Sequence, residues 1–156
     1  MVVAKSHEVH LALSQAFKER QVKKGYLALV TGRVAQESGV IDAPIGRDPR
    51  NRKRMAVVPG GREARTRFRV LTRFQGHTLL ELFPETGRTH QIRVHLASMG
   101  HPLVGDALYS RKAGHLGGRQ FLHAHYLAFQ HPVTGQWLEF TSGLPKDLER
   151  VLASVG

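Results

Sequence analysis

The sequence predicts an α+β fold with a mainly antiparallel sheet and flanking helices. Some apolar residues recur at the helical spacing of about 3.6, whereas other runs have the β-branched and aromatic composition of strands. Two turn-forming segments, Gln75-Gly76-His77 and residues 131–135, each separate a pair of strand-like runs, as in antiparallel hairpins. The 156 residues contain no internal repeat, low-complexity tract or clear linker, so they are expected to form one folded unit.

The first third of the chain is expected to contain a helix, a strand and a loop. Residues 7–22 place their apolar side chains closer to a spacing of 3.6 than to 2, which predicts an amphipathic helix. Residues 26–31, YLALVT, are a short β-rich run that ends at Gly32 and predict a strand. Residues 33–46 include a Gly turn and the segment APIG, which together indicate a loop.

The rest of the chain is expected to contain four strands and two helices. The strand-like runs are residues 64–74, 78–83, 122–129 and 137–140. Residues 90–100 predict a helix with Ile92, Leu96 and Met99 on one face and Gly100 at its end. The last predicted element is a short helix over residues 145–154.

The charge balance indicates a polyanionic partner. Lys and Arg total 23 against 12 acidic residues, which gives a net charge of +11. Such a surface attracts phosphate backbones, and nucleic acid is favoured over acidic lipid because no basic amphipathic helix has a large aromatic face. No apolar run is long enough to span a bilayer, and the first residues lack the pattern of a secretory signal. We therefore expect a cytoplasmic monomer whose partner is nucleic acid and not a membrane.

Cysteine is absent and histidine is frequent. With no cysteine, disulfides, thiolate nucleophiles and cysteine-bound metal are excluded, and a reducing compartment is compatible with the sequence. Among the ten histidines, His123 and His125 would share one face of a strand. No third ligand stands at a recognisable spacing from them, so no metal site is expected.

A strongly basic segment follows the predicted loop. Its cationic residues fall within eight positions and are Arg47, Arg50, Arg52, Lys53 and Arg54. No hydrophobic periodicity accompanies them, which indicates a solvated loop or hairpin. The segment is interpreted as a contact for a nucleic-acid backbone, with an ordinary solvated loop as the alternative.

The densest motif lies in residues 82–95, LFPETGRTHQIRVH, where a strand passes through a Gly turn into a helix. A helix start offers unpaired backbone N–H groups and the positive end of a dipole, so it suits an anion. Arg88 lies at this start and Arg93 lies about one and a half turns further on. The pattern predicts a site for a phosphate or a catalytic carboxylate. The alternative is that Arg93 pairs with a structural acid and that His90 and Gln91 cap local backbone.

Four segments in this order resemble a known family. They are KKGYLALVTG, PIGRDPRNRKRMAV, LLELFPETG and GRTHQIRVHLASMGHPLVGDALY. Together they resemble the RluA-type (RluA, RluC and RluD-like) pseudouridine synthases of large-subunit ribosomal RNA, from about Met1 to the segment HPVTGQWLEF. The resemblance implies a sheet with an RNA cleft and an isomerase that converts uridine to pseudouridine. It implies no metal and no organic cofactor.

The resemblance also assigns roles to individual residues. Tyr26 matches the active-site tyrosine that stacks on the flipped base and is a candidate proton acceptor. Arg93 matches the arginine that pairs with the catalytic aspartate and orients it. Arg88, His90 and Gln91 match the surroundings of that arginine and are expected to shape the pocket or contact RNA. An aromatic face offsets the stacking that an extruded base loses, and a guanidinium keeps a nucleophilic carboxylate ionised.

The sequence departs from the family pattern at the nucleophile. The family aspartate lies in an HRLD-x-x-TSG motif before a strand, and MVVAKS resembles the end of that strand. The four aspartates present, Asp42, Asp48, Asp106 and Asp147, do not replace it. Residues 1–156 are therefore expected to form a partial catalytic domain that lacks its N-terminal strands and is inactive alone. The alternatives are a non-catalytic RNA-binding module or a separate polypeptide that supplies the missing motif.

Overall fold

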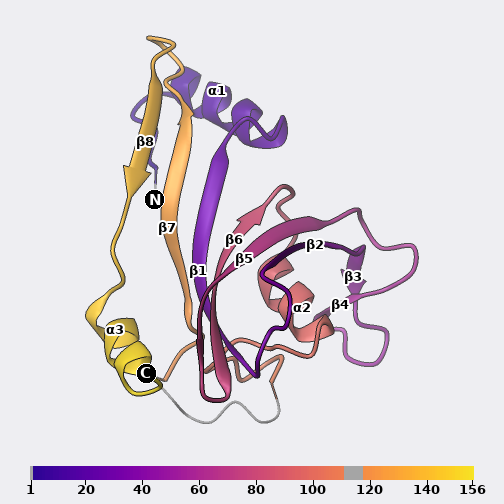
Figure 1. Ribbon diagram of the computed structural model, residues 1–156. Helices are drawn as coiled ribbons and strands as arrows, with labels where there is room; N and C mark the ends of the chain where they lie inside the picture. The colour runs from indigo at the N-terminus through magenta and orange to yellow at the C-terminus, as the bar shows by residue number, and fades with distance from the viewer. Residues whose placement is uncertain (1, 111–117) are drawn as a thin grey trace.

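An antiparallel sheet forms the centre of the computed structural model, which describes residues 2–110 and 118–156 (Figure 1). Within these residues the sheet has six strands in the order β2-β5-β6-β1-β7-β8. Their bounds are Lys23–Thr31 (β1), Ser38–Asp42 (β2), Arg65–Phe74 (β5), His77–Pro84 (β6), Leu122–Gln130 (β7) and Trp137–Thr141 (β8). The predicted α+β class with a mainly antiparallel sheet is confirmed.

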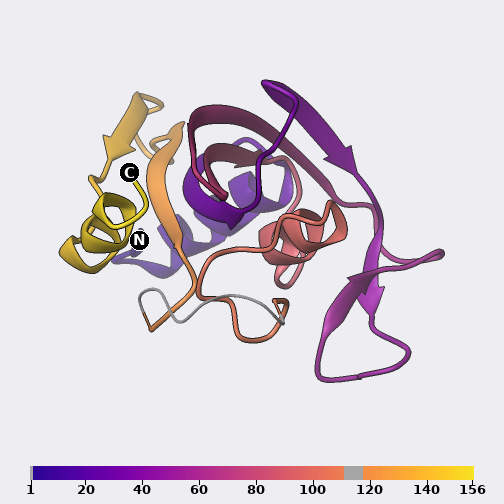
Figure 2. The same cartoon turned by 60° about the horizontal axis from the view of Figure 1, so that its bottom comes forward.

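Two short helices cover opposite faces of the sheet. The helix α2 (Gln91–Ser98) packs Ile92 and Leu96 against a core that includes Ala28 of β1. The helix α3 (Lys146–Ala153) packs Leu148 into a second core that includes Leu29 of the same strand. Neighbouring residues of a strand point to opposite faces, so the sheet lies between these two helices. Figure 2 shows them on either side of β1 and β7.

The first helix ends earlier than its apolar pattern predicted. The helix α1 spans His7–Lys18, and Ser6 caps its start by accepting a hydrogen bond from the Val9 N–H. Arg20 has a φ of 62°, a left-handed conformation that no helix continues. The chain turns there, and Val22 is buried beside Leu13 just before β1 begins. The prediction of a helix through residue 22 was therefore wrong at its end.

The predicted loop over residues 33–46 contains a strand that the sequence pattern missed. The strand β2 pairs in register with β5, for example Gly39 with Phe68 and Ile41 with Thr66. An edge strand of five residues depends on hydrogen bonds from a distant partner, and no local pattern reveals that partner. The basic segment is the connection of a small hairpin, β3 (Ile45–Arg47) and β4 (Met55–Val57), so the hairpin alternative is the observed one.

Gly25 allows a close approach between the neighbouring strands β1 and β7. The pairing of β1 with β7 shifts register between Gly25 and Tyr26. A Cβ atom added to Gly25 would lie 2.9 Å from the Tyr126 Cβ atom and 3.0 Å from the His125 Nε2 atom. The bulge therefore requires a residue without a side chain.

We expect Gly25→Ala to lower the free energy of unfolding by about 1–3 kcal/mol, because a clash inside a packed sheet forces backbone shifts. Gly143→Ala is the matched control, since its added Cβ atom meets nothing within 4 Å. Urea unfolding of both variants measures the difference. Equal stability of the two would contradict the packing argument.

Candidate active site and RNA-binding surface

Tyr26 and Arg93 line one cavity of about 380 Å³. β1 supplies Tyr26, the first turns of α2 supply Arg93, and the loop after β6 adds residues 86–88. Tyr26 is half-buried, and this burial raises the pKa of its phenol, so the group is protonated at neutral pH. The two predicted catalytic residues are therefore brought together, although they lie far apart in the sequence.

Arg93 forms a two-pronged ion pair with Asp106. Its Nε atom donates to Asp106 Oδ2 at 2.7 Å and its Nη2 atom donates to Oδ1 at 2.8 Å. The Asp106 side chain is fully buried, whereas 16% of the Arg93 side chain is exposed. Burial by itself would raise the pKa of Asp106, but hydrogen bonds from Arg93 and from backbone N–H groups outweigh it and lower the pKa. The structural acid considered for Arg93 is thus Asp106.

Tyr109 is a site residue to which the sequence analysis gave no role. Its hydroxyl lies 3.0 Å from His90 Nδ1 and accepts a hydrogen bond of 3.0 Å from the Met55 N–H. The guanidinium of Arg93 lies 4.9 Å from the centre of the Tyr109 ring. Asp106 Oδ1 accepts from the backbone N–H of Leu108 at 3.0 Å, which closes an Asx turn, and from that of Tyr109 at 3.1 Å. The sequence GDALY contained that turn signal, but not the contact with Arg93.

Gln91 holds the loop of the cavity together. The Gln91 residue is only 4% exposed. Its Oε1 atom accepts hydrogen bonds from Thr86 Oγ1 and the Arg88 N–H, and its Nε2 atom donates to Arg65 O and Thr66 Oγ1. Gln91 was expected either to shape the pocket or to contact RNA, and these hydrogen bonds are of the kind that shapes the pocket. Contact of Gln91 with RNA stays a prediction.

His90 and Arg88 flank the start of α2. His90 occupies the position before the helix with a left-handed φ of 55°, which is rare for a residue other than glycine. Burial, followed by the nearby charge of Arg93, lowers the pKa of His90. The Arg88 Nε atom donates to Glu63 O at 2.8 Å, and Arg88 also lines the cavity. Capping of local backbone was considered for His90 and Gln91. Among the described residues the His90 side chain makes no such bond, whereas Gln91 Oε1 accepts from the Arg88 N–H at 3.0 Å, so capping is observed for Gln91 alone.

The turn of the β3–β4 hairpin directs its cations outward. Its acidic and amide side chains bond to the turn itself, because Asp48 Oδ1 accepts from the Arg50 N–H and Asn51 Oδ1 accepts from the Lys53 N–H. Four cationic residues are exposed, namely Arg47, Arg50, Arg52 and Lys53. Arg54 is partly buried, and its guanidinium lies 5.1 Å from the centre of the Tyr109 ring. The predicted basic segment therefore lies next to the cavity and is tied to it through Tyr109.

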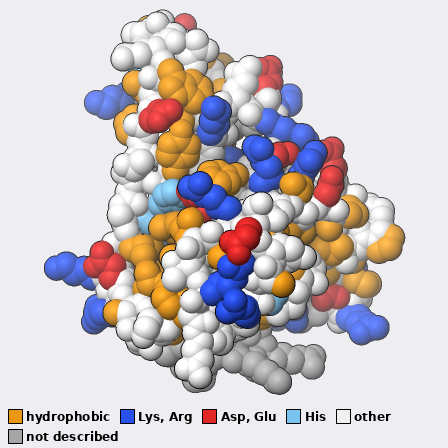
Figure 3. Space-filling model, viewed as in Figure 1, with side chains coloured by type: hydrophobic (Ala, Val, Ile, Leu, Met, Phe, Trp, Pro, Cys, Tyr) orange, Lys and Arg blue, Asp and Glu red, His pale blue; other side chains and the backbone are white. Residues whose placement is uncertain are grey.

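Further cations lie on the sheet. Figure 3 shows Lys and Arg side chains gathered across the middle of one face, with acidic side chains among them. Arg69 and Arg67 of β5 pair with Glu81 and Glu85, respectively. Lys24, by contrast, lines the cavity of Tyr26, and burial lowers its pKa.

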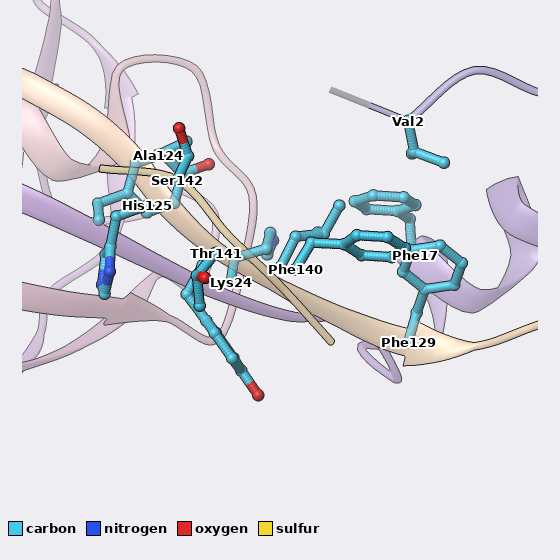
Figure 4. A pocket seen from close by; sticks show the side chains of 12 residues that line it. Val2, Phe17, Lys24, Ala124, His125, Phe129, Phe140, Thr141 and Ser142 are labelled. Atoms are coloured by element: carbon cyan, nitrogen blue, oxygen red, sulfur yellow. The ribbon is translucent and has the colours of Figure 1, made fainter. Parts of the chain in front are cut away.

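A second cavity, of about 440 Å³, has a different chemistry (Figure 4). It is lined largely by aromatic and aliphatic side chains, including Phe17, Phe129 and Phe140. The rings of Phe129 and Phe140 are stacked with their centres 5.9 Å apart. Tyr26 lines this cavity too. Arg88 and Arg93, by contrast, line the cavity of about 380 Å³ and not this one.

The two histidines of the pair lie next to different protein groups. His123 Nε2 lies 3.1 Å from Ser142 O, and His125 Nε2 lies 2.9 Å from Glu81 Oε1. In the part of the chain that the structure describes, no three His, Asp or Glu side chains converge as a metal site would require. No helix in residues 2–110 or 118–156 has the length and apolar character needed to cross a membrane.

Fold and site together define an antiparallel α+β domain with a tyrosine and an arginine in a cavity beside a basic hairpin. The model of the RNA pseudouridylate synthase family matches residues 1–98, and the chain belongs to this family. The resemblance to RluA-type synthases that the motifs indicated is confirmed.

Relatives from bacteria and from human support this membership. The chain is 54% identical over 153 residues to an RNA pseudouridine synthase of Chloroflexus aurantiacus, covering 97% of this chain and 48% of that protein. It is 48% identical over 163 residues to the ribosomal large subunit pseudouridine synthase D of Nitrosomonas europaea, covering 99% of this chain and 47% of that protein. The structure of human RNA Pseudouridylate Synthase Domain Containing 1 superposes with a TM-score of 0.82 at 31% identity, covering 96% of this chain and 66% of that one. The chain thus spans about half the length of these curated bacterial relatives.

Proposed function

We propose that this chain carries part of the active site of an enzyme that converts uridine to pseudouridine in large-subunit ribosomal RNA, in the cytoplasm and without a metal or organic cofactor. The observation that carries the proposal is the single cavity lined by both Tyr26 and Arg93. Family membership supplies the reaction, and the basic hairpin beside the cavity suits a phosphate backbone.

Each of the two residues has a definite role in this proposal. The aromatic ring of Tyr26, whose phenol is protonated, stacks on the extruded uracil. It replaces part of the stacking that the base loses when it leaves the RNA base stack. Arg93 uses its Nε and Nη2 atoms for Asp106. Its Nη1 atom has no hydrogen-bond partner among residues 2–110 and 118–156, so it can bind a nucleophilic carboxylate, which a guanidinium keeps ionised.

We further propose that residues 1–156 do not isomerise uridine by themselves. No carboxylate is among the described residues that line the cavity. Asp106 is buried against Arg93, and Asp147 pairs with Arg119. Asp42 lies near Arg65, and Asp48 belongs to the hairpin turn. A nucleophile supplied from outside residues 1–156 would complete the site.

A pseudouridine assay on a large-subunit ribosomal RNA transcript tests both proposals. We expect no turnover by residues 1–156 and turnover by a gene product that extends upstream through an HRLD-type motif. Turnover by residues 1–156 alone would refute the proposed inactivity. An inactive extended protein would refute the proposed reaction.

A second candidate function is RNA binding without chemistry, which the net charge of +11 and the exposed hairpin cations favour. It predicts that replacing Arg50, Arg52 and Lys53 with glutamine weakens RNA binding and makes it less sensitive to salt. For single-stranded RNA the slope of log affinity against log salt should fall by about 2, because each phosphate contact contributes about 0.7.

The matched control for this binding test removes three exposed lysines that lie away from the hairpin, Lys5, Lys18 and Lys146. We expect a clearly smaller change in slope for this control variant. Fluorescence anisotropy across a salt series gives both slopes. The same slope in the hairpin variant and the parent would exclude the hairpin as an RNA contact.

A further inference from the structure

Tyr109 contacts both the RNA-facing hairpin and the arginine of the cavity. On the hairpin side, the Arg54 guanidinium lies 5.1 Å from the centre of the Tyr109 ring. The Tyr109 hydroxyl accepts a hydrogen bond from the Met55 N–H at the start of β4. On the cavity side, the Arg93 guanidinium lies 4.9 Å from the same ring centre. Its hydroxyl also lies 3.0 Å from His90 Nδ1. One partly buried side chain thus joins two parts of the site.

The cavity end of this arrangement is held by hydrogen bonds to Asp106. Asp106 Oδ1 accepts from the Tyr109 backbone N–H at 3.1 Å and from Arg93 Nη2 at 2.8 Å. The same buried carboxyl group therefore positions both the tyrosine and the guanidinium. A displacement of the Tyr109 ring would change the surroundings of Arg93 directly.

The hairpin end is held less completely. The Arg54 Nε atom is buried and has no hydrogen-bond partner among the described residues. Its guanidinium rests over the Tyr109 ring, where the attraction between a cation and an aromatic face holds it. Arg54 is also the last cation of the basic turn, so an RNA phosphate bound there would compete with the ring for its guanidinium.

We infer that Tyr109 is a positioning residue, which links RNA bound at the hairpin to the setting of Arg93 in the cavity. This inference rests on the proposed RNA-directed function of the same site. Binding of a phosphate at Arg54 shifts the Tyr109 ring. The ring in turn shifts the Arg93 guanidinium relative to the nucleophilic carboxylate. Arg93 is then set for its nucleophile only when RNA occupies the hairpin.

The test follows the ¹H–¹⁵N resonance of the Arg93 Nε–H group by NMR on residues 1–156, with a short oligouridylate as the probe. Without RNA, Arg54→Gln is expected to move this resonance, because it removes a cation from the ring that Arg93 also contacts. The matched variant Arg50→Gln removes an exposed cation of the same turn, which has no contact with the Tyr109 ring within the described part of the chain. It should leave the resonance in place.

With RNA, the parent chain is expected to show a shift of the Arg93 resonance. Tyr109→Leu should lose most of that shift while still binding oligouridylate through the hairpin cations. Tyr109→Phe keeps the ring and loses the hydroxyl contacts to Met55 and His90, so an intermediate response is expected. The backbone spectrum of each variant establishes that it is folded.

Two results would overturn the inference. One is an undiminished response of Arg93 to RNA in folded Tyr109→Leu. The other is an Arg54→Gln spectrum in which Arg93 moves no further than in Arg50→Gln. If Tyr109→Leu does not fold, Tyr109→Phe and the Arg54 and Arg50 pair decide the question. A parent chain that does not bind oligouridylate would contradict the proposed function, while the comparison without RNA still tests the link.

Discussion

Replacing Gln91 with leucine is expected to lower the free energy of unfolding by about 4 kcal/mol. The amide makes four hydrogen bonds, and the variant would leave the Arg65 carbonyl, the Arg88 N–H and the hydroxyl groups of Thr66 and Thr86 without it. Thr66 is fully buried and Thr86 is 3% exposed, so water cannot readily replace the lost partner. The Arg88 N–H loses its one hydrogen-bond partner among the described residues, and an unsatisfied buried group costs about 1–3 kcal/mol. The Arg65 carbonyl and the two threonine hydroxyls each keep another partner, so each of their lost bonds costs about 1 kcal/mol.

Gln36→Leu is the matched control for this substitution, because the Gln36 side chain is exposed on the loop before β2. We expect its effect to stay within about 0.5 kcal/mol. Urea unfolding of both variants, with unchanged m-values, measures the two losses. A loss at Gln91 no larger than that at Gln36 would show that the network contributes little.

Replacing Arg93 with glutamine is expected to cost about 3 kcal/mol at neutral pH. The substitution leaves the fully buried Asp106 carboxylate with its backbone N–H donors but without its cation. Removing one member of a buried pair is far more costly than the pair's net contribution, because the other charge stays desolvated. The control is Arg119→Gln, whose pair with Asp147 is 43% exposed on both sides and should matter little.

The cost of Arg93→Gln should depend on pH in a definite direction. The pKa of Asp106 is lowered in the folded protein, so the group stabilises the fold above the pKa of an unfolded aspartate, about 3.9. This contribution is lost as the pH falls through the lower folded pKa. In Arg93→Gln the burial of Asp106 is no longer offset by the arginine, so the pKa of Asp106 rises.

Unfolding in urea over an acid pH series measures this dependence. The difference between the parent and Arg93→Gln should be largest at neutral pH and should shrink as Asp106 becomes protonated. If the difference in the free energy of unfolding does not change with pH, protonation of Asp106 does not determine the cost of Arg93→Gln.

The sequence predicted most elements of the fold because their patterns are local. The strands flanking the Gln75-Gly76 turn and the helix that carries Ile92 and Leu96 follow from periodicity and turn residues. The strand β2 was missed because its pairing with β5 is its main support. The end of α1 was misplaced because Val22 continues the apolar pattern while belonging to the turn after the helix.

The candidate site was predicted in part. Tyr26 and Arg93 were recognised through their motifs, and the structure adds that they share a cavity. The partner of Arg93 was left open, since nothing local identifies which acid reaches it. The sequence did not predict the role of Tyr109 or the buried position of Gln91. Their hydrogen-bond partners come from distant segments such as β4 and β5, which no local pattern identifies.

The position of β1 within the sheet has a consequence for synthesis on the ribosome. The strand pairs on one side with β6 (His77–Pro84) and on the other with β7 (Leu122–Gln130). Both partners are translated long after β1, and β7 comes last. A nascent chain therefore carries β1 with one unpaired edge until residues near 130 leave the exit tunnel. Contacts of such long sequence separation slow folding, and this edge is where a chaperone would protect the emerging chain from association.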